Sequence, residues 1–179
     1  VENLMRTPSI NSLILQFDSA LRALNGVGNP ARPSPANPVE QQQLNESERK
    51  ISARLMRVNH CGEICAQALY VGQGLTSEDP QIQETMQQAA REETDHLLWC
   101  EARLGELNSH KSYLNPFFYT MSFVSGALSG LLGNRFNLGF VAATEEQVVK
   151  HLEAHLQALP CEDKRSHVIL EQMKIDEDQ

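Results

Sequence analysis

The fold of this chain is decided by the stretch Met86-Gln-Gln-Ala-Ala-Arg-Glu-Glu-Thr-Asp-His-Leu-Leu-Trp-Cys-Glu-Ala-Arg-Leu104. Its apolar residues recur with the spacing of one face of an α-helix. Glu93 and His96 interrupt that apolar face. Because they are three residues apart, a helix places their carboxylate and imidazole groups one turn apart on the same side. The stretch therefore predicts a helix that carries a polar pair into a protein core.

Three further segments have the same helical period, and each carries one glutamate on its apolar face. They are Glu46 to Gly72 with Glu63, Phe117 to Leu159 with Glu145, and Glu162 onward with Glu177. The quoted stretch belongs to a segment from Pro80 to Leu104, and the third segment has a break near Gly133-Asn134. No strand pattern accompanies these segments. We therefore expect an all-α bundle.

Four glutamates inside one bundle need a counter-charge, because an isolated buried charge costs several kcal/mol even after relaxation. Two metal cations bridged by carboxylates would neutralise them. Di-iron carboxylate bundles in general use a glutamate from each of two helices and Glu-x-x-His from the other two. Here Glu177 is followed by Asp178-Gln179, so the second Glu-x-x-His pair needs a histidine directly after Gln179. We expect that histidine, and we interpret the chain as ending inside its last helix.

The composition excludes some functions. The 179 residues carry 15 Lys and Arg against 23 Asp and Glu, a formal charge of -8, and aromatic residues make up 6%. A general nucleic-acid binder needs a basic face or an aromatic stacking platform, so we expect no nucleic-acid partner. The acidic excess is explained either by a solvated surface or by carboxylates that bind a cation inside the protein.

The four cysteines, Cys61, Cys65, Cys100 and Cys161, form no C-x-x-C pair. A zinc site built from Cys61, Cys65, His60 and His96 is an alternative, but it lacks the usual second pair of closely spaced ligands. Residues 112–134 carry no charge, and Phe117 to Leu132 is a short helical piece for a membrane span, which needs about 20 apolar residues. This piece is either a buried core helix or an apolar surface that enters one leaflet of a membrane.

The N-terminal part differs from the rest of the chain. Pro8 to Asn25 has the pattern of a short amphipathic helix, and the proline-rich run from Gly26 to Pro38 is typical of an extended connector. We therefore divide the chain into residues 1–45, a helix with its connector, and residues 46–179, the bundle.

Five motifs together resemble the demethoxyubiquinone hydroxylase family of ubiquinone biosynthesis, over about Ser47 to the end of the chain. They are Arg57-Val-Asn-His-Cys-Gly-Glu-Ile64, then Ala66 with Tyr70-Val-Gly-Gln73, Glu93-x-x-His96-Leu97, Ala142-Ala-Thr-Glu-Glu-Gln-Val-Val149 and Ile175-Asp-Glu-Asp-Gln179. A lone Glu-x-x-His would be a weak signal, whereas the joint motifs are specific.

This resemblance implies a ferritin-like four-helix bundle with additional N-terminal and membrane-facing helices, and a non-haem di-iron centre. The implied iron ligands are Glu63, Glu93, His96, Glu145 and Glu177. The implied reaction is hydroxylation of the ring of a polyprenyl demethoxyubiquinol with dioxygen. The family further implies a peripheral enzyme on the cytoplasmic face of the bacterial inner membrane, with other ubiquinone-biosynthesis proteins as candidate partners.

His151 follows Glu145 by six residues and is either a relay of protons or electrons beside the metal ligands or a surface histidine. Two other functions remain as alternatives for the whole chain. A ferritin-like iron-handling or peroxide-reducing protein would use the same ligands, but it predicts no long uncharged segment. A non-enzymatic helical lipid-binding or scaffold protein would carry no stoichiometric metal.

Overall fold

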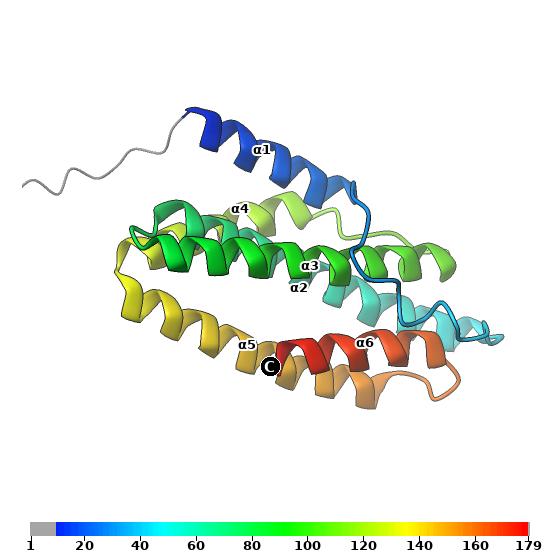
Figure 1. The fold of residues 1–179 in the computed structure, drawn as a ribbon. Coiled ribbons are helices and arrows are strands. Elements are labelled where there is room, and N and C mark those ends of the chain that lie inside the picture. Colours follow the sequence, from blue (N-terminus) through cyan, green and yellow to red (C-terminus); the bar gives the residue numbers. More distant parts are fainter. Residues whose placement is uncertain (1–9, 179) are drawn as a thin grey trace, which may run out of the picture.

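The computed structural model describes residues 10–178, and this part of the chain contains six α-helices and no strand (Figure 1). The helices are α1 Ile10–Asn25, α2 Glu46–Thr76, α3 Pro80–Glu106, α4 Asn115–Leu131, α5 Asn134–Ala158 and α6 Lys164–Glu177. The predicted all-α class is confirmed, and the arrangement is consistent with a ferritin-like bundle to which α1 and α4 are added. Pro8 and Ser9, where the predicted first helix begins, lie outside the described residues.

Side-chain caps explain where the helices begin. The Asn45 side chain accepts a hydrogen bond from the Glu48 backbone at 3.0 Å, and the Glu48 carboxylate accepts one from the Asn45 backbone at 2.8 Å. This capping box starts α2 at the predicted residue. Helix α6 begins two residues later than expected from Glu162, because Asp163 caps it by accepting a bond from the Ser166 backbone at 3.0 Å.

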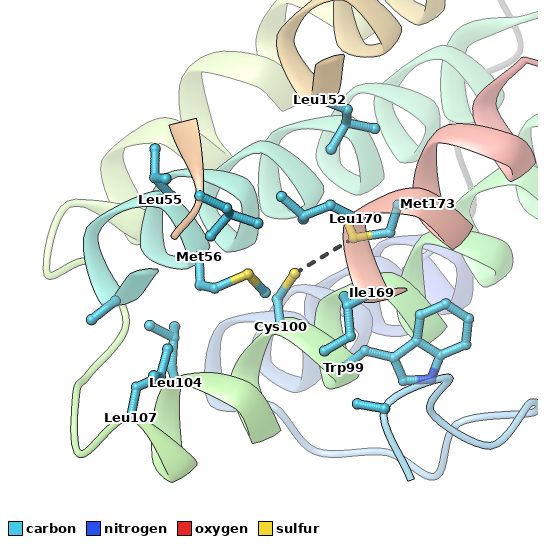
Figure 2. Packing of buried hydrophobic residues seen from close by; sticks show 13 residues of the cluster. Leu55, Met56, Trp99, Cys100, Leu104, Leu107, Leu152, Ile169, Leu170 and Met173 are labelled. Carbon is cyan, nitrogen blue, oxygen red and sulfur yellow. Dashed lines mark hydrogen bonds between the residues drawn. The ribbon is translucent and has the colours of Figure 1, made fainter. Parts of the chain in front are cut away.

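The four bundle helices α2, α3, α5 and α6 enclose a core beside the predicted metal ligands. In Figure 1, α2 and α3 run alongside each other, and α5 and α6 form an antiparallel hairpin against them. Figure 2 shows side chains from all four helices meeting in this core, with the Cys100 thiol 3.8 Å from the Met173 sulfur. Cys100 is buried, whereas Cys161 is exposed. The core members labelled there are Leu55, Met56, Trp99, Cys100, Leu104, Leu107, Leu152, Ile169, Leu170 and Met173.

Helix α2 extends to Thr76, four residues beyond the expected end at Gly72, and it contacts α4 over this last part. The two backbones approach so closely that a Cβ on Gly72 would overlap the Phe123 carbonyl oxygen. A Cβ on Gly126 of α4 would likewise overlap the Leu69 carbonyl oxygen. Glycine at 72 is therefore a packing requirement rather than a helix end.

The uncharged segment forms α4, which has one face buried against α2 and one exposed apolar face, while its entry into a membrane leaflet stays a prediction. Its small residues Gly126, Ser129 and Gly130 are buried against α2, whereas Phe117 and Leu128 are exposed. Gly133, at a φ of 95° that favours glycine, separates α4 from α5. None of the helices described here combines the length and the apolar character that crossing a membrane requires.

The connector between α1 and α2 lies across the bundle rather than away from it (Figure 1). Residues 29–45 contain turns and extended backbone but no helix. Ala36 is buried in the core cluster, and Arg165 of α6 donates a hydrogen bond to the Val39 carbonyl oxygen at 2.9 Å. The connector thus contains turns, such as the one closed by the bond from Asn37 N–H to the Ser34 carbonyl oxygen at 3.0 Å, where an extended segment was predicted, and it is attached to the bundle.

The contact between α2 and α4 predicts opposite effects for two glycine-to-alanine substitutions. Gly126→Ala should lower the free energy of unfolding by about 1–3 kcal/mol, because the new methyl group has no space between the backbones. Gly139→Ala is the matched control: Gly139 is an exposed position in α5 with nothing near its Cβ, and alanine there should stabilise the helix by up to about 1 kcal/mol. Urea denaturation measures both, and equal stability of the two variants would contradict the close contact.

Candidate metal centre

Three helices bring one group of metal-binding side chains together. Glu63 comes from α2, Glu93 and His96 from α3, and Glu177 from the end of α6. One ligand atom from each of the four lies within 4.8 Å of the others. Among the described residues, these four side chains form the group that could hold a metal ion. Glu63, Glu93 and His96 are at most 4% exposed, so the group lies inside the protein.

The imidazole of His96 points one nitrogen at three carboxylates. Its Nδ1 lies 3.5 Å from Glu63 Oε2, 3.5 Å from Glu93 Oε2 and 3.6 Å from Glu177 Oε1. Within residues 10–178, neither His96 Nδ1 nor Glu93 Oε2 has a hydrogen-bond partner, although both are buried. Buried polar atoms without partners are rare in proteins. Atoms of this kind, converging on one point, fit a divalent cation with carboxylate and imidazole ligands.

Electrostatics in the group favour either bound protons or a bound cation. Burial, followed by the charge of Glu63, raises the pKa of Glu93 to about 8. Burial and the charge of Glu93 raise the pKa of Glu177 to about 8. Burial opposes protonation of His96, but the carboxylates of Glu63 and Glu93 prevail and raise its pKa to about 11. A metal ion would displace these protons, since carboxylate and imidazole ligands bind in their deprotonated forms.

The fifth predicted ligand, Glu145, lies on α5 outside this group. It is half-buried, and burial together with the charge of Glu93 raises its pKa. The hydroxyl of Tyr70 acts in the opposite direction on Glu145. Tyr70 packs in the apolar cluster of α2, α3 and α5, and burial together with the surrounding carboxylates raises its pKa. The structure thus gathers four of the five predicted ligands and leaves Glu145 beside them.

Asp176 contacts the candidate metal ligand His96, and the sequence patterns did not identify it. Its Oδ2 lies 2.9 Å from His96 Nε2, the ring nitrogen that faces away from the carboxylates. Burial opposes ionisation of Asp176, but hydrogen bonds from Arg32 and His96 prevail and lower its pKa to about 2. A metal-bound histidine usually has such a partner, which fixes the tautomer and the orientation of the ring. Its position directly before Glu177 in the sequence is the signal that could have identified it.

A cavity of about 250 Å³ lies between α2, α5 and the end of α6, and it borders the carboxylate group. Glu63 and Glu177 line it, and so does the predicted relay residue His151. His151 is solvent-exposed, and its ring centroid lies 3.9 Å from that of His155. The remaining lining residues are Asn59, Gly62, Ala66, Thr144, Gln147, Val148 and Leu152. His151 is therefore placed between solvent and the cavity.

The alternative zinc ligands are not gathered in the described structure. Cys61 and Cys65 are half-buried free thiols on α2, and neither belongs to the group that contains His96. His60 is buried against a different neighbour, with its Nε2 3.7 Å from Glu101. Cysteine and imidazole donors therefore do not converge as a tetrahedral zinc site requires.

The raised pKa values predict that the metal-free protein loses stability as pH rises from about 5 to about 8. The folded state keeps protons on Glu93 and Glu177 up to a pKa of about 8, and His96 acts in the same direction. The unfolded chain releases its glutamate protons near pH 4.3, so the folded state binds more protons in this window and stability falls. Urea denaturation with a chelator, at pH of about 5.5 and 8, measures the slope.

Glu93→Gln should flatten this slope, because the amide carries no titratable proton. Glu92→Gln is the matched control, since Glu92 is exposed on the same helix and should leave the slope as it is in the wild type. A wild-type stability that stays constant or rises across the window would contradict the buried carboxylate group.

The part of the chain that matches known proteins includes the candidate metal centre. The family described as "Ubiquinone biosynthesis protein COQ7" matches residues 50–179. A protein of Pseudomonas putida (strain GB-1) named 3-demethoxyubiquinol 3-hydroxylase is 55% identical over 171 residues, which are 95% of this chain and 80% of the relative. A protein of the same name from Pseudomonas fluorescens (strain Pf0-1) is 55% identical over 170 residues, 94% of this chain and 79% of the relative. The chain therefore belongs to the ubiquinone biosynthesis protein COQ7 family.

Proposed function

We propose that this chain is a monooxygenase that hydroxylates the ring of a polyprenyl demethoxyubiquinol with dioxygen, as a step of ubiquinone biosynthesis. The observation that carries the proposal is the buried group of three carboxylates and one imidazole at the edge of a cavity. Relatives that are 55% identical over 95% of this chain are named for the same reaction. A scaffold protein would have no reason to bury this group beside a cavity.

Two iron ions are the cofactor in this proposal. Glu63, Glu93, His96 and Glu177 would hold them, with Glu145 joining from α5, and the unpartnered Nδ1 of His96 and Oε2 of Glu93 support this choice of ligands. Iron suits mixed carboxylate and imidazole ligands and supplies the electrons that activate dioxygen. The chain itself orients the ligands: Asp176 holds Nε2 of His96, so that Nδ1 faces the carboxylates.

The reaction inserts one oxygen atom of dioxygen into a ring C–H bond, and the other oxygen atom leaves as water. Two electrons and two protons from a reductant complete the balance. In this proposal the ring occupies the cavity, whose volume of about 250 Å³ suits a substituted ring rather than a polyprenyl tail. Ala66, Val148 and Leu152 in its wall would keep water away from the reacting ring. Asn59 and Gln147 offer hydrogen bonds to the ring oxygens.

His151 fits the role of a proton relay between solvent and this cavity. It lies at the cavity wall with Glu63 and Glu177, and its ring is close to that of His155. Burial and the charge of His151 lower the pKa of His155 to about 4, so His155 stays neutral near pH 7. The Asn59 side chain, 2.8 Å from His155 Nδ1, fixes that ring. His151, which is exposed and lines the cavity, is therefore the better candidate of the two histidines for the relay.

The outer face of α4 is proposed to contact the membrane in which the polyprenyl substrate is dissolved. Its exposed apolar side chains recur at helical spacing along one side of the helix, at Phe117, Met121, Val124, Leu128 and Leu131. An apolar stripe of this kind inserts into the headgroup region of one leaflet. We therefore infer a peripheral protein on the cytoplasmic face of the inner membrane, next to other proteins of the same biosynthesis.

A strain that lacks this protein should accumulate the demethoxy quinone and contain little ubiquinone. The wild-type gene and Glu92→Gln should restore ubiquinone, whereas Glu93→Gln should leave its content at least about 100-fold lower, because removal of a ligand or its partner weakens metal binding strongly. Quinone extraction and mass spectrometry measure the products. Iron analysis of the same purified proteins should show two irons per chain in the wild type and a loss in Glu93→Gln.

Wild-type ubiquinone content in the strain that lacks the protein would overturn the proposed reaction. Stoichiometric iron without any effect on quinones would favour an iron-handling or peroxide-reducing protein. A wild-type protein without iron would favour the scaffold alternative.

Membrane contact through α4 should be lost when its apolar stripe is made polar. The double variant Phe117→Ser, Leu128→Ser should bind vesicles of phosphatidylethanolamine and phosphatidylglycerol more than about 10-fold more weakly, since each buried apolar side chain contributes about 1.5–3 kcal/mol. Val58→Ser, an exposed apolar residue on α2, is the control and should bind as the wild type does. Vesicle co-sedimentation measures both, and undiminished binding of the double variant would exclude α4 as the contact.

A further inference from the structure

The connector attaches to the bundle at the residues that flank the metal ligands. The Ala31 backbone donates a hydrogen bond to Asp95 Oδ1 at 2.6 Å, and Arg32 Nε donates one to Asp95 Oδ2 at 3.0 Å. Arg32 Nη2 lies 2.8 Å from Asp176 Oδ2. Asp95 directly precedes His96 in the sequence, and Asp176 directly precedes Glu177. One arginine of the connector thus joins α3 and α6 at the positions next to two candidate ligands.

The indole of Trp99 holds the same arginine from its other side. Trp99 Nε1 donates a hydrogen bond to the Arg32 carbonyl oxygen at 3.3 Å, and the Arg32 guanidinium carbon lies 5.0 Å from the Trp99 ring centroid. Figure 2 shows the indole nitrogen of Trp99 directed toward the connector. The guanidinium therefore has a fixed plane, set by the ring and by two carboxylates, although its side chain is 43% exposed.

The contact with Asp176 links Arg32 to the metal site. The Asp176 oxygen that faces Arg32 at 2.8 Å is the same oxygen, Oδ2, that lies 2.9 Å from His96 Nε2. This position of Asp176 keeps Nε2 of His96 occupied and leaves Nδ1 facing Glu63, Glu93 and Glu177. Asp176 on its own would be repelled by these carboxylates, because like charges at short range in a protein interior disfavour each other. Arg32 supplies the positive charge that holds Asp176 in place.

We propose that Arg32 is a positioning residue of the metal centre, and that the connector is thereby part of the site. Arg32 orients Asp176, and Asp176 orients the imidazole of His96 for the metal. This inference rests on the proposed function, because it requires that the carboxylate group binds metal. It differs from a merely structural attachment of the connector, which would affect folding stability but not the affinity of the folded protein for metal.

Arg32→Gln tests the proposal, with Arg165→Gln as the matched control. Arg165 also attaches the connector, through the Val39 carbonyl oxygen at 2.9 Å, but it contacts neither Asp176 nor Asp95 in the described structure. Anaerobic titration of the metal-free chain with Fe²⁺, and with Co²⁺ followed by its visible absorption, measures affinity and ligand geometry. Arg32→Gln should weaken metal binding by about 10- to 100-fold and change the Co²⁺ spectrum, because partners of metal ligands have effects of this size.

Three further comparisons complete the test. Arg165→Gln should bind metal within about twofold of the wild type, since the partners of His96 are intact. Arg32→Lys should recover only part of the affinity, because an ammonium group lacks the planar fork that reaches two carboxylates. Asp176→Asn and Arg32→Gln together should weaken binding no more than Asp176→Asn alone, as expected when one residue acts through the other.

Three outcomes would overturn the inference, and they are distinguishable. If the wild type binds metal and Arg32→Gln binds it with equal affinity and an unchanged Co²⁺ spectrum, the positioning role is wrong while the proposed function stands. If the wild type itself binds neither Fe²⁺ nor Co²⁺, both fail together. Equal weakening by Arg32→Gln and Arg165→Gln would also overturn it, because attachment of the connector alone would then explain the effect.

Discussion

The burial of three carboxylates around one imidazole is the constraint on which the rest of this structure depends. Taking charges out of water costs several kcal/mol for each ion, and only protons, a cation or paired charges offset that cost. In this structure, charged groups face both nitrogens of the His96 ring. Its Nδ1 faces Glu63, Glu93 and Glu177, where a metal would bind, and its Nε2 faces Asp176, which in turn is paired with Arg32. The helices α2, α3 and α6 and the connector thus each contribute a side chain to one charge arrangement.

Helical periodicity was sufficient to predict most of this site. Glu63, Glu93 and His96 lie where an ideal helix carries them, inward from long helices whose phase is set by many apolar neighbours. Glu145 was predicted by the same logic, but α5 packs less tightly and leaves this residue half-buried beside the group. Periodicity gives the face of a helix, whereas the distance of that face from its neighbours depends on the packing of other elements.

Two features lay beyond any local pattern. Gly72 resembled a helix end, but the reason for glycine there is the backbone of α4, more than forty positions away in the sequence. The pairing of Asp176 with Arg32 could not be predicted from the sequence. The connector has no helical or strand periodicity, so its sequence does not indicate which residues of the bundle it contacts. Arg32 is nevertheless the single basic residue between Gly26 and Asn45, and its two partners Asp95 and Asp176 directly precede candidate ligands. These signals become informative only once the path of the connector is known.

The path of the connector also sets an order of events during synthesis. Arg32 leaves the ribosome before α3 and long before α6, yet its partners are Asp95, 63 positions later, and Asp176 in the last described helix. Contacts between such distant positions form late, because the loop between them must close first. The contact of Arg32 with Asp176 therefore forms only after α6 has docked, whereas its contact with Asp95 can form once α3 is in place. A chain folded only as far as α3 would present Glu63, Glu93 and His96 without Glu177, so the candidate metal site is complete only when α6 has joined α2 and α3.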